Sequence, residues 1–425
     1  MRLRPRSFYL SLLTAALAHA LPALAADAEL DALDLESAPE VSTPAAASST
    51  KVFFEGAWGN AEQRYAPASR ALGRASLDLS YAGKLTPDVR AVFSDRLDYM
   101  DPAEAGSDAT VNSLREAYLS WQPGGGNTIY ELGRINLRYG PGYGYNPTDF
   151  FRDGSLRTLT SSNPFAMREN RLGSAMLRAQ RLWQGGSLSV AYSPKLEDRA
   201  SPSGWDLDLG ATNNRNRGLV ALSTQFSQKL SSQWLLYKEQ GESAAVGANM
   251  TALLSDAAVA HVEWSNASEL DATSRALGLP SAATRRNRFA GGVTYTTLGK
   301  LSVTAEYQYN GFGASQQDWV ALSTAPMSAK VAYLIDARAR QELVSRQALM
   351  LYVTQKDLFI KDLDLTAFVR FNTEDHSRQS WLELRQHWPK YDLALQWQQF
   401  SGKSDSEYGI LPDSRIVQVL GNYYF

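Results

Sequence analysis

The sequence predicts an all-β fold, a transmembrane antiparallel β-barrel of about 18 strands. Three observations predict it: segments with period-two alternation recur from Val52 to Phe425, short and long connections alternate between them, and the last strand ends on an aromatic residue. The mean hydropathy of −0.31 agrees with a barrel. In a membrane barrel, lipid-facing apolar residues alternate with polar residues that face the lumen, so no long apolar run is needed.

Residues 1–25 are typical of a signal peptide. Three arginines among the first six residues give a basic start, residues 8–21 are apolar, and residues 23–25 form a small-residue cleavage site. The apolar run is short for a spanning helix and is followed by Pro22, so a retained anchor is the weaker interpretation. We therefore expect the mature chain to be exported.

Residues 26–50 are predicted to form a disordered acidic leader in the periplasm. They hold six acidic residues, no Lys or Arg, and a run of Ala, Ser and Thr, a composition that cannot bury a core. The remaining residues, 51–425, form the predicted outer-membrane barrel. The chain has no Cys, which excludes a disulfide framework and a thiol-bound metal.

The predicted barrel is nearly neutral. The chain has 42 basic and 44 acidic residues; three of the basic ones lie in the predicted signal peptide and six of the acidic ones in the leader, which leaves 39 basic and 38 acidic residues in 51–425. Nucleic-acid binding is therefore not indicated, and any ion preference must come from local arrangement. The excess of Arg over Lys indicates either contacts with anions, which Arg binds in a planar fork, or a GC-rich genome.

Short turns alternate with mostly longer loops along the chain. Short periplasmic turns and long external loops are the usual asymmetry of these barrels, and the even strand number of about 18 that they imply returns both chain ends to the periplasm. The turns are predicted at 83–88, 123–127, 183–186, 228–232, 255–256, 297–299, 357–361 and 389–390. The loops are predicted at 60–73, 100–112, 140–169, 194–216, 240–245, 266–286, 312–345, 373–377 and 401–414.

The last strand favours a barrel that closes in lipid over a strand of a soluble sandwich. Val417, Val419, Tyr423 and Phe425 share one face of this strand and would point outward. The stretch resembles the carboxyl-terminal assembly signal of Gram-negative outer-membrane barrels, which ends on Phe. The resemblance implies insertion by the barrel-assembly machinery, with outer-membrane lipid and lipopolysaccharide as the surrounding partners.

The segment from Tyr130 to Asp153 is the least ordinary part of the chain. It begins as a strand in which Arg134, Asn136 and Arg138 share the face opposite the apolar residues, and it continues into a passage rich in Gly, Pro and Tyr within the third long loop. Glycines in such a passage permit close backbone approach and positive φ.

This segment resembles a motif of proteobacterial outer-membrane porin-like barrels related to the eighteen-stranded alginate-export channel. The resemblance implies passage or export of a polymer or a hydrophobic small molecule. The matching positions are Gly133-Arg134, Asn146-Pro147-Thr148-Asp149 and Arg168-Glu169-Asn170-Arg171-Leu172-Gly173.

In general porins the third loop folds into the lumen and narrows it, and we expect the same here. Asp149, Arg152 and Asp153 would then face charged wall residues, and opposed charges order polar solutes while Arg clusters favour carboxylates. The alternative is that these Arg and Asp side chains pair to hold the loop shut, and both interpretations can hold together. The candidates for lining the pore or its constriction are Arg134, Asn136, Arg138, Asn146, Asp149, Arg152, Asp153, Arg178, Glu306, Arg370, Glu383 and Arg385.

The sequence shows no catalytic or cofactor-binding motif. The histidines of the mature chain, His261, His376 and His387, form no cluster with metal-ligand spacing, and no phosphate loop is present. We therefore predict a protein that is not an enzyme and that needs no metal or cofactor. The predicted function is an outer-membrane channel of a Gram-negative bacterium for a polar solute, an anionic one or a polymer. The alternative is a non-conducting partner of a periplasmic exporter or of a surface-polymer assembly system.

Overall fold

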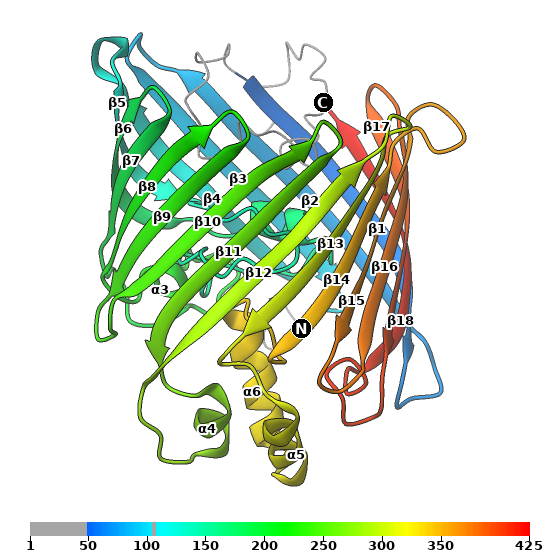
Figure 1. Ribbon diagram of the computed structural model, residues 1–425. Coiled ribbons are helices and arrows are strands. Elements are labelled where there is room, and N and C mark those ends of the chain that lie inside the picture. The colour runs from blue at the N-terminus through cyan, green and yellow to red at the C-terminus, as the bar shows by residue number, and fades with distance from the viewer. Residues whose placement is uncertain (1–48, 104–107) are drawn as a thin grey trace, which may run out of the picture.

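The computed structural model describes residues 49–103 and 108–425 (Figure 1). Within them, 18 antiparallel strands form one closed sheet, which confirms the predicted all-β barrel. The predicted signal peptide and nearly all of the acidic leader lie outside the described residues, so both stay predictions.

Every strand pairs with the strands that precede and follow it in the chain. The strands are β1 (Ser49–Gln63), β2 (Arg70–Lys84), β3 (Val89–Asp101), β4 (Thr110–Trp121), β5 (Thr128–Ile135), β6 (Ser174–Trp183), β7 (Gly186–Ser193), β8 (Arg217–Ser227), β9 (Leu230–Glu239), β10 (Ala245–Ser255), β11 (Ala258–Glu269), β12 (Thr284–Thr296), β13 (Leu301–Asn310), β14 (Gln347–Gln355), β15 (Leu363–Asn372), β16 (Arg378–His387), β17 (Tyr391–Ser401) and β18 (Asp413–Tyr424).

Short helices lie in the connections between strands. None of the helices in the described part of the chain is long and apolar enough to cross a membrane. They are η2 (Pro123–Gly125), α2 (Pro164–Glu169), α3 (Leu209–Thr212), α4 (Ala272–Leu277), α5 (Gln316–Thr324) and α6 (Met327–Ala339).

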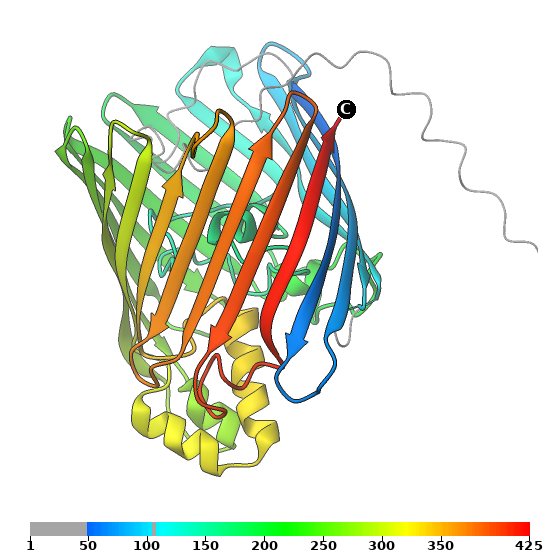
Figure 2. The same ribbon diagram turned by 90° about the vertical axis from the view of Figure 1, so that its right-hand side faces the viewer.

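The barrel closes between its first and last strands. Gly56 of β1 pairs with Gly421 of β18 on one side and with Ala75 of β2 on the other. The backbone amide of Phe425 donates to the carbonyl oxygen of Val52 at 3.1 Å. The carboxyl terminus therefore lies beside the first strand, at the end of the barrel that carries the short turns (Figures 1 and 2).

The strands alternate between an apolar outer face and a buried inner face. Leu119 of β4 pairs with Leu132 of β5, which pairs with Leu177 of β6, and these three side chains are 50%, 65% and 53% exposed. On β7, by contrast, the inward Ser187 and Ser189 are buried. A band of large exposed apolar side chains fits a lipid-facing surface.

The connections have the predicted asymmetry. Eight short turns join strands at one end of the barrel, and nine loops join them at the other, the longest being 136–173, 194–216 and 311–346. The helices α4 and α5 belong to these loops and lie beyond the lower rim in Figure 1. The number and the order of the connections thus match the sequence analysis.

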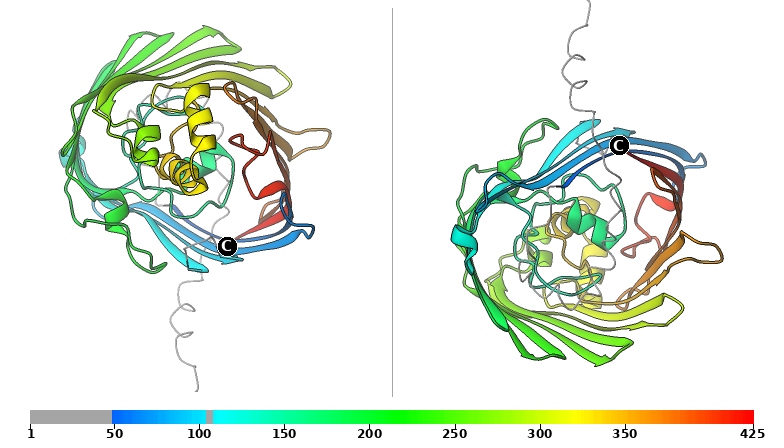
Figure 3. Two further views of the ribbon diagram at one scale, coloured as in Figure 1. Left: turned by 90° about the horizontal axis from the view of Figure 1, so that it is seen from below. Right: turned by 90° about the horizontal axis from the view of Figure 1, so that it is seen from above.

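The third of these loops, residues 136–173, folds into the barrel, and we call it the lumen loop. Viewed along the barrel axis from either end, it lies inside the ring of strands and carries the helix α2 (Figure 3). The lumen loop therefore decides what space remains for a solute.

Candidate functional site

A glycine directs the chain out of the wall where the lumen loop begins. Gly133 has a φ of +138°, and a Cβ placed on it would lie 2.3 Å from the carbonyl oxygen of Ala117. Only glycine tolerates both this φ value and this close approach. Two residues later, at Ile135, β5 ends and the chain turns into the lumen.

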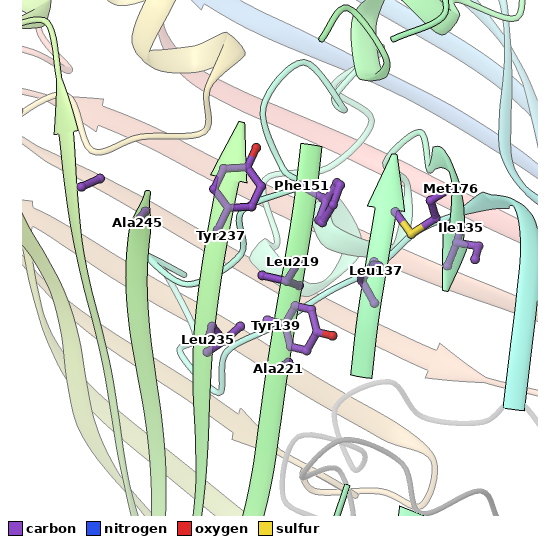
Figure 4. Close-up of a cluster of buried hydrophobic side chains, with 12 residues drawn as sticks. Ile135, Leu137, Tyr139, Phe151, Met176, Leu219, Ala221, Leu235, Tyr237 and Ala245 are labelled. Atoms are coloured by element: carbon purple, nitrogen blue, oxygen red, sulfur yellow. The ribbon is translucent and has the colours of Figure 1, made fainter. Parts of the chain in front are cut away.

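Apolar packing fixes the lumen loop against the inner faces of the neighbouring strands. Leu137, Tyr139 and Phe151 from the loop lie in one buried cluster with Leu219 of β8 and Leu235 of β9 (Figure 4). Burial of an apolar side chain of this size stabilises a fold by about 1.5–3 kcal/mol. This side of the lumen is therefore a packed core and not a water-filled channel wall.

A buried carboxylate on β11 holds the tip of the lumen loop. Glu263 is fully buried and accepts hydrogen bonds from the backbone amide of Gly142 at 2.5 Å, from Asn146 Nδ2 at 2.8 Å and from Thr148 Oγ1 at 3.0 Å. Hydrogen bonds to a charged group are about twice as strong as neutral ones. The predicted site residue Asn146 is thus a contact between the loop and the wall.

A second buried carboxylate, on β13, continues this attachment. Glu306 accepts from the backbone amides of Tyr143 at 2.7 Å and Gly144 at 2.9 Å. It also lies 3.0 Å from His261 Nε2 and accepts from Gln308 Nε2 at 2.6 Å. The two wall carboxylates therefore satisfy consecutive backbone donors of the loop, which would otherwise be buried without partners.

Two glycines make this close approach possible. A Cβ on Gly140, which has a φ of +95°, would lie 2.2 Å from the carboxylate oxygens of Glu263. A Cβ on Gly144 would lie 2.2 Å from the Sδ atom of Met350. The Gly-rich passage predicted from sequence is thus explained by contact of the loop backbone with the wall.

Ion pairs join the lumen loop to the end of the barrel that carries the long loops, which we call the loop mouth. Arg152 contacts Glu342 at 2.6 Å, and Arg288 bridges Glu342 at 3.1 Å and Glu269 at 2.7 Å. Arg340 also pairs with Glu269, at 2.8 Å. Burial alone would raise the pKa of Glu342, but Arg152, Arg288 and Arg340 outweigh it and lower this pKa to about 2.

We expect replacement of Glu342 by glutamine to destabilise the barrel by about 3 kcal/mol near neutral pH, because it leaves the buried Arg152 without a carboxylate partner and Arg288 with Glu269 alone. A pKa lowered from 4.5 gives a stabilisation that is complete above pH 4.5 and is lost as the pH falls toward 2. Thermal unfolding followed by circular dichroism should therefore show a difference in melting temperature between wild type and Glu342→Gln, and this difference should narrow below pH 4.5. A difference that stays constant down to pH 2 would contradict this assignment.

The far end of the lumen loop reaches the opposite side of the barrel. Thr158 Oγ1 donates to Asp98 of β3 at 3.1 Å, and Ser162 Oγ donates to Gln398 of β17 at 3.0 Å. The loop is thus attached to β3 and β17 as well as to β11 and β13. It crosses the lumen and constricts it, as the sequence analysis expected.

The wall formed by β1 to β4 carries a network of charged side chains on its inner face. Arg96 contacts Glu55 at 2.7 Å, Asp98 at 2.9 Å and Asp78 at 3.4 Å, and Arg115 contacts Asp78 at 2.6 Å. These groups are mostly paired with one another. A solute that moves along this wall would therefore meet ion pairs of both signs and not a row of free cations.

The later group of predicted residues lies on the inner faces of β15 to β17. Arg385 makes two hydrogen bonds to Glu383, at 2.8 and 3.0 Å, and Glu383 also accepts from Gln396. Arg370 donates to the carbonyl oxygen of Gly144 at 2.5 Å. Arg370 is thus a further attachment of the lumen loop, whereas Glu383 and Arg385 pair within the wall.

A cavity of about 630 Å³ lies between the lumen loop and the external loops. Its lining includes nine acidic residues and six arginines, so a solute that enters meets more acidic than basic groups. This balance does not favour anions at the mouth, and any anion preference would have to arise elsewhere. Charged lining residues include Arg152, Asp153, Arg157, Glu239, Arg288 and Glu342.

The structure places Arg134 differently from the prediction. Its pairing with Ala117 and Ala175 puts it on the same outer face as Leu132, where it is 4% exposed and donates to the carbonyl oxygen of Leu207 at 2.5 Å. Arg138 lies beyond the end of β5, is exposed and forms no ion pair within the described residues. These two arginines are thus not brought together.

Two other predicted residues lie at the base of the lumen loop. Asp149 pairs with Arg171 at 2.9 Å and is 2% exposed, and Asn136 Nδ2 donates to the carbonyl oxygen of Arg168 at 3.0 Å. These contacts join the beginning of the loop to its end. They agree with the alternative in which charged pairs hold the loop in place.

Arg178 and Asp153 complete the predicted set. Arg178 pairs with Glu131 on the neighbouring strand at 2.9 Å, and Asp153 lines the cavity at the loop mouth. Burial raises the pKa of Asp153, and Arg340 and Arg215 oppose that shift. The pore-lining role of the set stays a prediction, and the placement of Arg134 on the outer face argues against that role for this residue.

Sequence reasoning did not select Glu263, Arg288 or Glu342, although they hold the lumen loop. Glu263 follows the same pattern that selected Glu306, an acidic residue on the inner face of a strand. A charged residue at an inward position is expected throughout a wide barrel. The pattern therefore identifies such residues as a group without showing which of them meet the loop.

Comparisons with known proteins agree on the fold. No protein-family model matches the chain, and no curated protein matches its sequence. Solved structures similar to this chain include OccAB1 of Acinetobacter baumannii, with a TM-score of 0.56 and 10% identity over 89% of this chain and 96% of that one. OccK5 (OpdH) of Pseudomonas aeruginosa has a TM-score of 0.54 at 10% identity, over 89% and 98% of the chains. OprB of Pseudomonas putida has a TM-score of 0.50 at 10% identity, over 89% and 94%.

These similarities, together with the closed 18-stranded sheet and the loop folded into its lumen, define the fold as that of outer-membrane porins. At about one identical residue in ten, the similarity concerns the fold alone. The relation to the alginate-export channel stays a prediction.

Proposed function

We propose that this protein is an outer-membrane channel for polar solutes, constricted by the lumen loop. The observation that carries this proposal is the course of residues 136–173 across the lumen, with polar attachments to both sides of the wall. Porin folds with a loop in this position conduct small solutes through the space that the loop leaves. The similarity to solved porins supports the fold on which the proposal rests.

The geometry favours small polar solutes over polymers. The lumen loop is attached to β3, β11, β13 and β17, so passage of a polymer would require these contacts to break. The anion preference expected from the Arg content is the weaker part of the proposal, because the arginines of the inner wall are mostly paired and the mouth has an excess of acid.

In this proposal the short turns and both ends of the barrel chain face the periplasm, and the long loops face outward. The exposed apolar band would contact outer-membrane lipid, with lipopolysaccharide around the loop end. The barrel-assembly machinery would insert the chain through its last strand. The acidic leader would be free to meet a periplasmic exporter component.

Planar-bilayer conductance of the refolded mature protein tests this function. We expect steady conductance, and the reversal potential in a salt gradient measures the ion preference. Arg138→Ala should shift that potential toward cation preference, because Arg138 is an exposed arginine without an ion pair in the described chain. Arg181→Ala is the matched control, since Arg181 is also exposed but lies beside the turn after β6.

A specific observation favours the alternative, a non-conducting docking partner: on one side of the lumen the loop packs as an apolar core against Leu219 of β8 and Leu235 of β9. A barrel that stays silent in the bilayer while its circular dichroism shows a folded β-structure would contradict the channel proposal. In that case, cross-linking from residues 26–50 to periplasmic proteins would test the docking function.

A further inference from the structure

The barrel wall has a gap beside β4 at its loop end. β5 pairs with β4 only from Ala117 to Trp121, and β5 leaves the wall after Ile135. Residues 110–116 of β4 therefore have no partner strand on this side within the described chain. An unpaired strand edge presents free amide and carbonyl groups and must be covered.

A segment of the loop between β7 and β8 covers this edge. We call residues 201–208 the wall cap. The carbonyl oxygen of Gly204 accepts from the backbone amide of Asn112 at 2.7 Å, in the place where a strand would pair. A Cβ on Gly204 would lie 2.1 Å from the carbonyl oxygen of Thr110, so only glycine fits at this contact. The wall here is thus a loop and not a strand.

The outer side of the wall cap is apolar. Trp205 is 65% exposed and Leu207 is 52% exposed. Figure 3 shows the loop between β7 and β8 on the outside of the ring of strands. Large exposed apolar side chains at this position fit contact with the outer leaflet of a membrane.

The inner side of the wall cap faces the 630 Å³ cavity. Ser201, Ser203, Gly204 and Asp208 of the cap line that cavity, together with Leu156 of the lumen loop. The cap is therefore the layer of chain that separates the cavity from the outside of the barrel at this place.

The side chains of two arginines hold the wall cap by hydrogen bonds to its backbone carbonyl oxygens. Arg157 of the lumen loop donates to the carbonyl oxygens of Ser203 at 2.5 Å, Asp206 at 2.6 Å and Asn112 at 2.8 Å. Arg134 donates to the carbonyl oxygen of Leu207, and its Nη2 atom is buried without a partner. The backbone amide of Gly204 also donates to Asp108 Oδ2 at 2.7 Å. The cap is thus held by a few hydrogen bonds to its backbone, each worth about 1.5–3 kcal/mol where one partner is charged.

We infer that the wall cap is a lateral door through which amphiphiles pass between the outer leaflet and the cavity. Displacement of the cap would open the gap beside β4 and release hydrogen-bond donors from Arg134, Arg157 and Asn112 at its rim. These donors suit an amphiphile with an apolar tail and a hydrogen-bond-accepting head group, such as a carboxylate or an ester. This route is independent of ion flow along the barrel axis.

The test uses photo-cross-linking in phosphatidylcholine vesicles that contain alkyne-tagged oleate. Benzoylphenylalanine replaces Leu156, which lines the cavity, or Leu119, which is 50% exposed on the lipid face. The chain has no native cysteine, so Asn112→Cys and Ser203→Cys can be joined by a short bis-maleimide that fastens the wall cap to β4. The same double-cysteine protein without the cross-linker is the matched control.

We expect oleate to label position 156 in the control and to label it several-fold less once the cap is fastened, with position 119 labelled equally in both. Labelling at 156 that persists after fastening would show entry through the mouth and overturn the lateral route. Labelling at 119 without labelling at 156 would also overturn it.

A second variant tests the door without a cross-linker. Gly204→Ala forces the cap away from Thr110, so labelling at position 156 should rise, whereas Gly218→Ala on β8 should leave it unchanged because a Cβ there lies 3.9 Å from its nearest neighbour. Equal labelling in both variants would count against the door. Conductance of the same proteins reports on the channel proposal separately.

Discussion

Replacing Glu263 and Glu306 together with alanine is expected to free the tip of the lumen loop and to raise single-channel conductance several-fold. The two carboxylates accept hydrogen bonds from Gly142, Tyr143 and Gly144 of the loop. Hydrogen bonds to a charged group contribute about 1.5–3 kcal/mol each. Without them, the loop amides would find water in the lumen more easily than a partner on the wall.

Two control variants distinguish the release of the lumen loop from the extra space that smaller side chains leave in the lumen. Glu383→Ala removes an inner-wall carboxylate that bonds to Arg385 and Gln396 in the wall and not to the lumen loop, so it should change conductance little. The double replacement of Glu263 and Glu306 by glutamine keeps one acceptor oxygen at each position and should have a smaller effect than alanine. Conductance and thermal stability that stay at wild-type values in the double-alanine variant would contradict the proposed role.

Deletion of Phe425 is expected to abolish most insertion of the barrel into the outer membrane. The last residue makes the final bond of the closing seam, from its amide to Val52, and its ring packs edge-on against Tyr423 at 5.1 Å. The deletion removes this contact and the aromatic end of the proposed assembly signal. The measurement is the amount of heat-modifiable protein in isolated outer membranes.

Phe425→Tyr is the matched control, because it keeps an aromatic ring and a full-length strand. This variant should insert at close to the wild-type level. Wild-type amounts of heat-modifiable protein after the deletion would show that the closing seam and the signal tolerate loss of the last residue. Refolding of the deleted protein in detergent separates a defect in assembly from a defect in the barrel itself.

The strands could be predicted because their signal is local. Alternation along β7 places Ser187 and Ser189 inside and Leu188 and Val190 outside, and the sequence carries this period directly. Turn and loop lengths are equally local properties. The predicted strand count and the alternation of short turns at one end of the barrel with loops at the other were therefore confirmed. Lipid on one side of the sheet enforces this pattern, since a slip by one residue would turn polar groups into the membrane.

Alternation failed as a guide where the lumen is filled by protein. Arg134 was expected on the inner face opposite Ile135, yet Ile135 lies in the buried apolar cluster and Arg134 on the outer face under the wall cap. The rule that polar residues face the lumen assumes water inside the barrel. At the loop end of β5 the inside is an apolar core made by the lumen loop, so the polarity of the two faces is reversed at Arg134 and Ile135, whereas Leu132 still faces outward.

The sequence by itself predicted a closed barrel of about 18 strands, with eight turns at one end and nine loops at the other, and the structure has this number of strands. Only the tertiary structure decided how the lumen loop is held and where the wall is completed by a loop. Glu263 and Gly142 are 121 residues apart, and Arg152 and Glu342 are 190 apart. Strand alternation is set by neighbouring residues, whereas the choice among many inward carboxylates depends on which one the folded loop reaches.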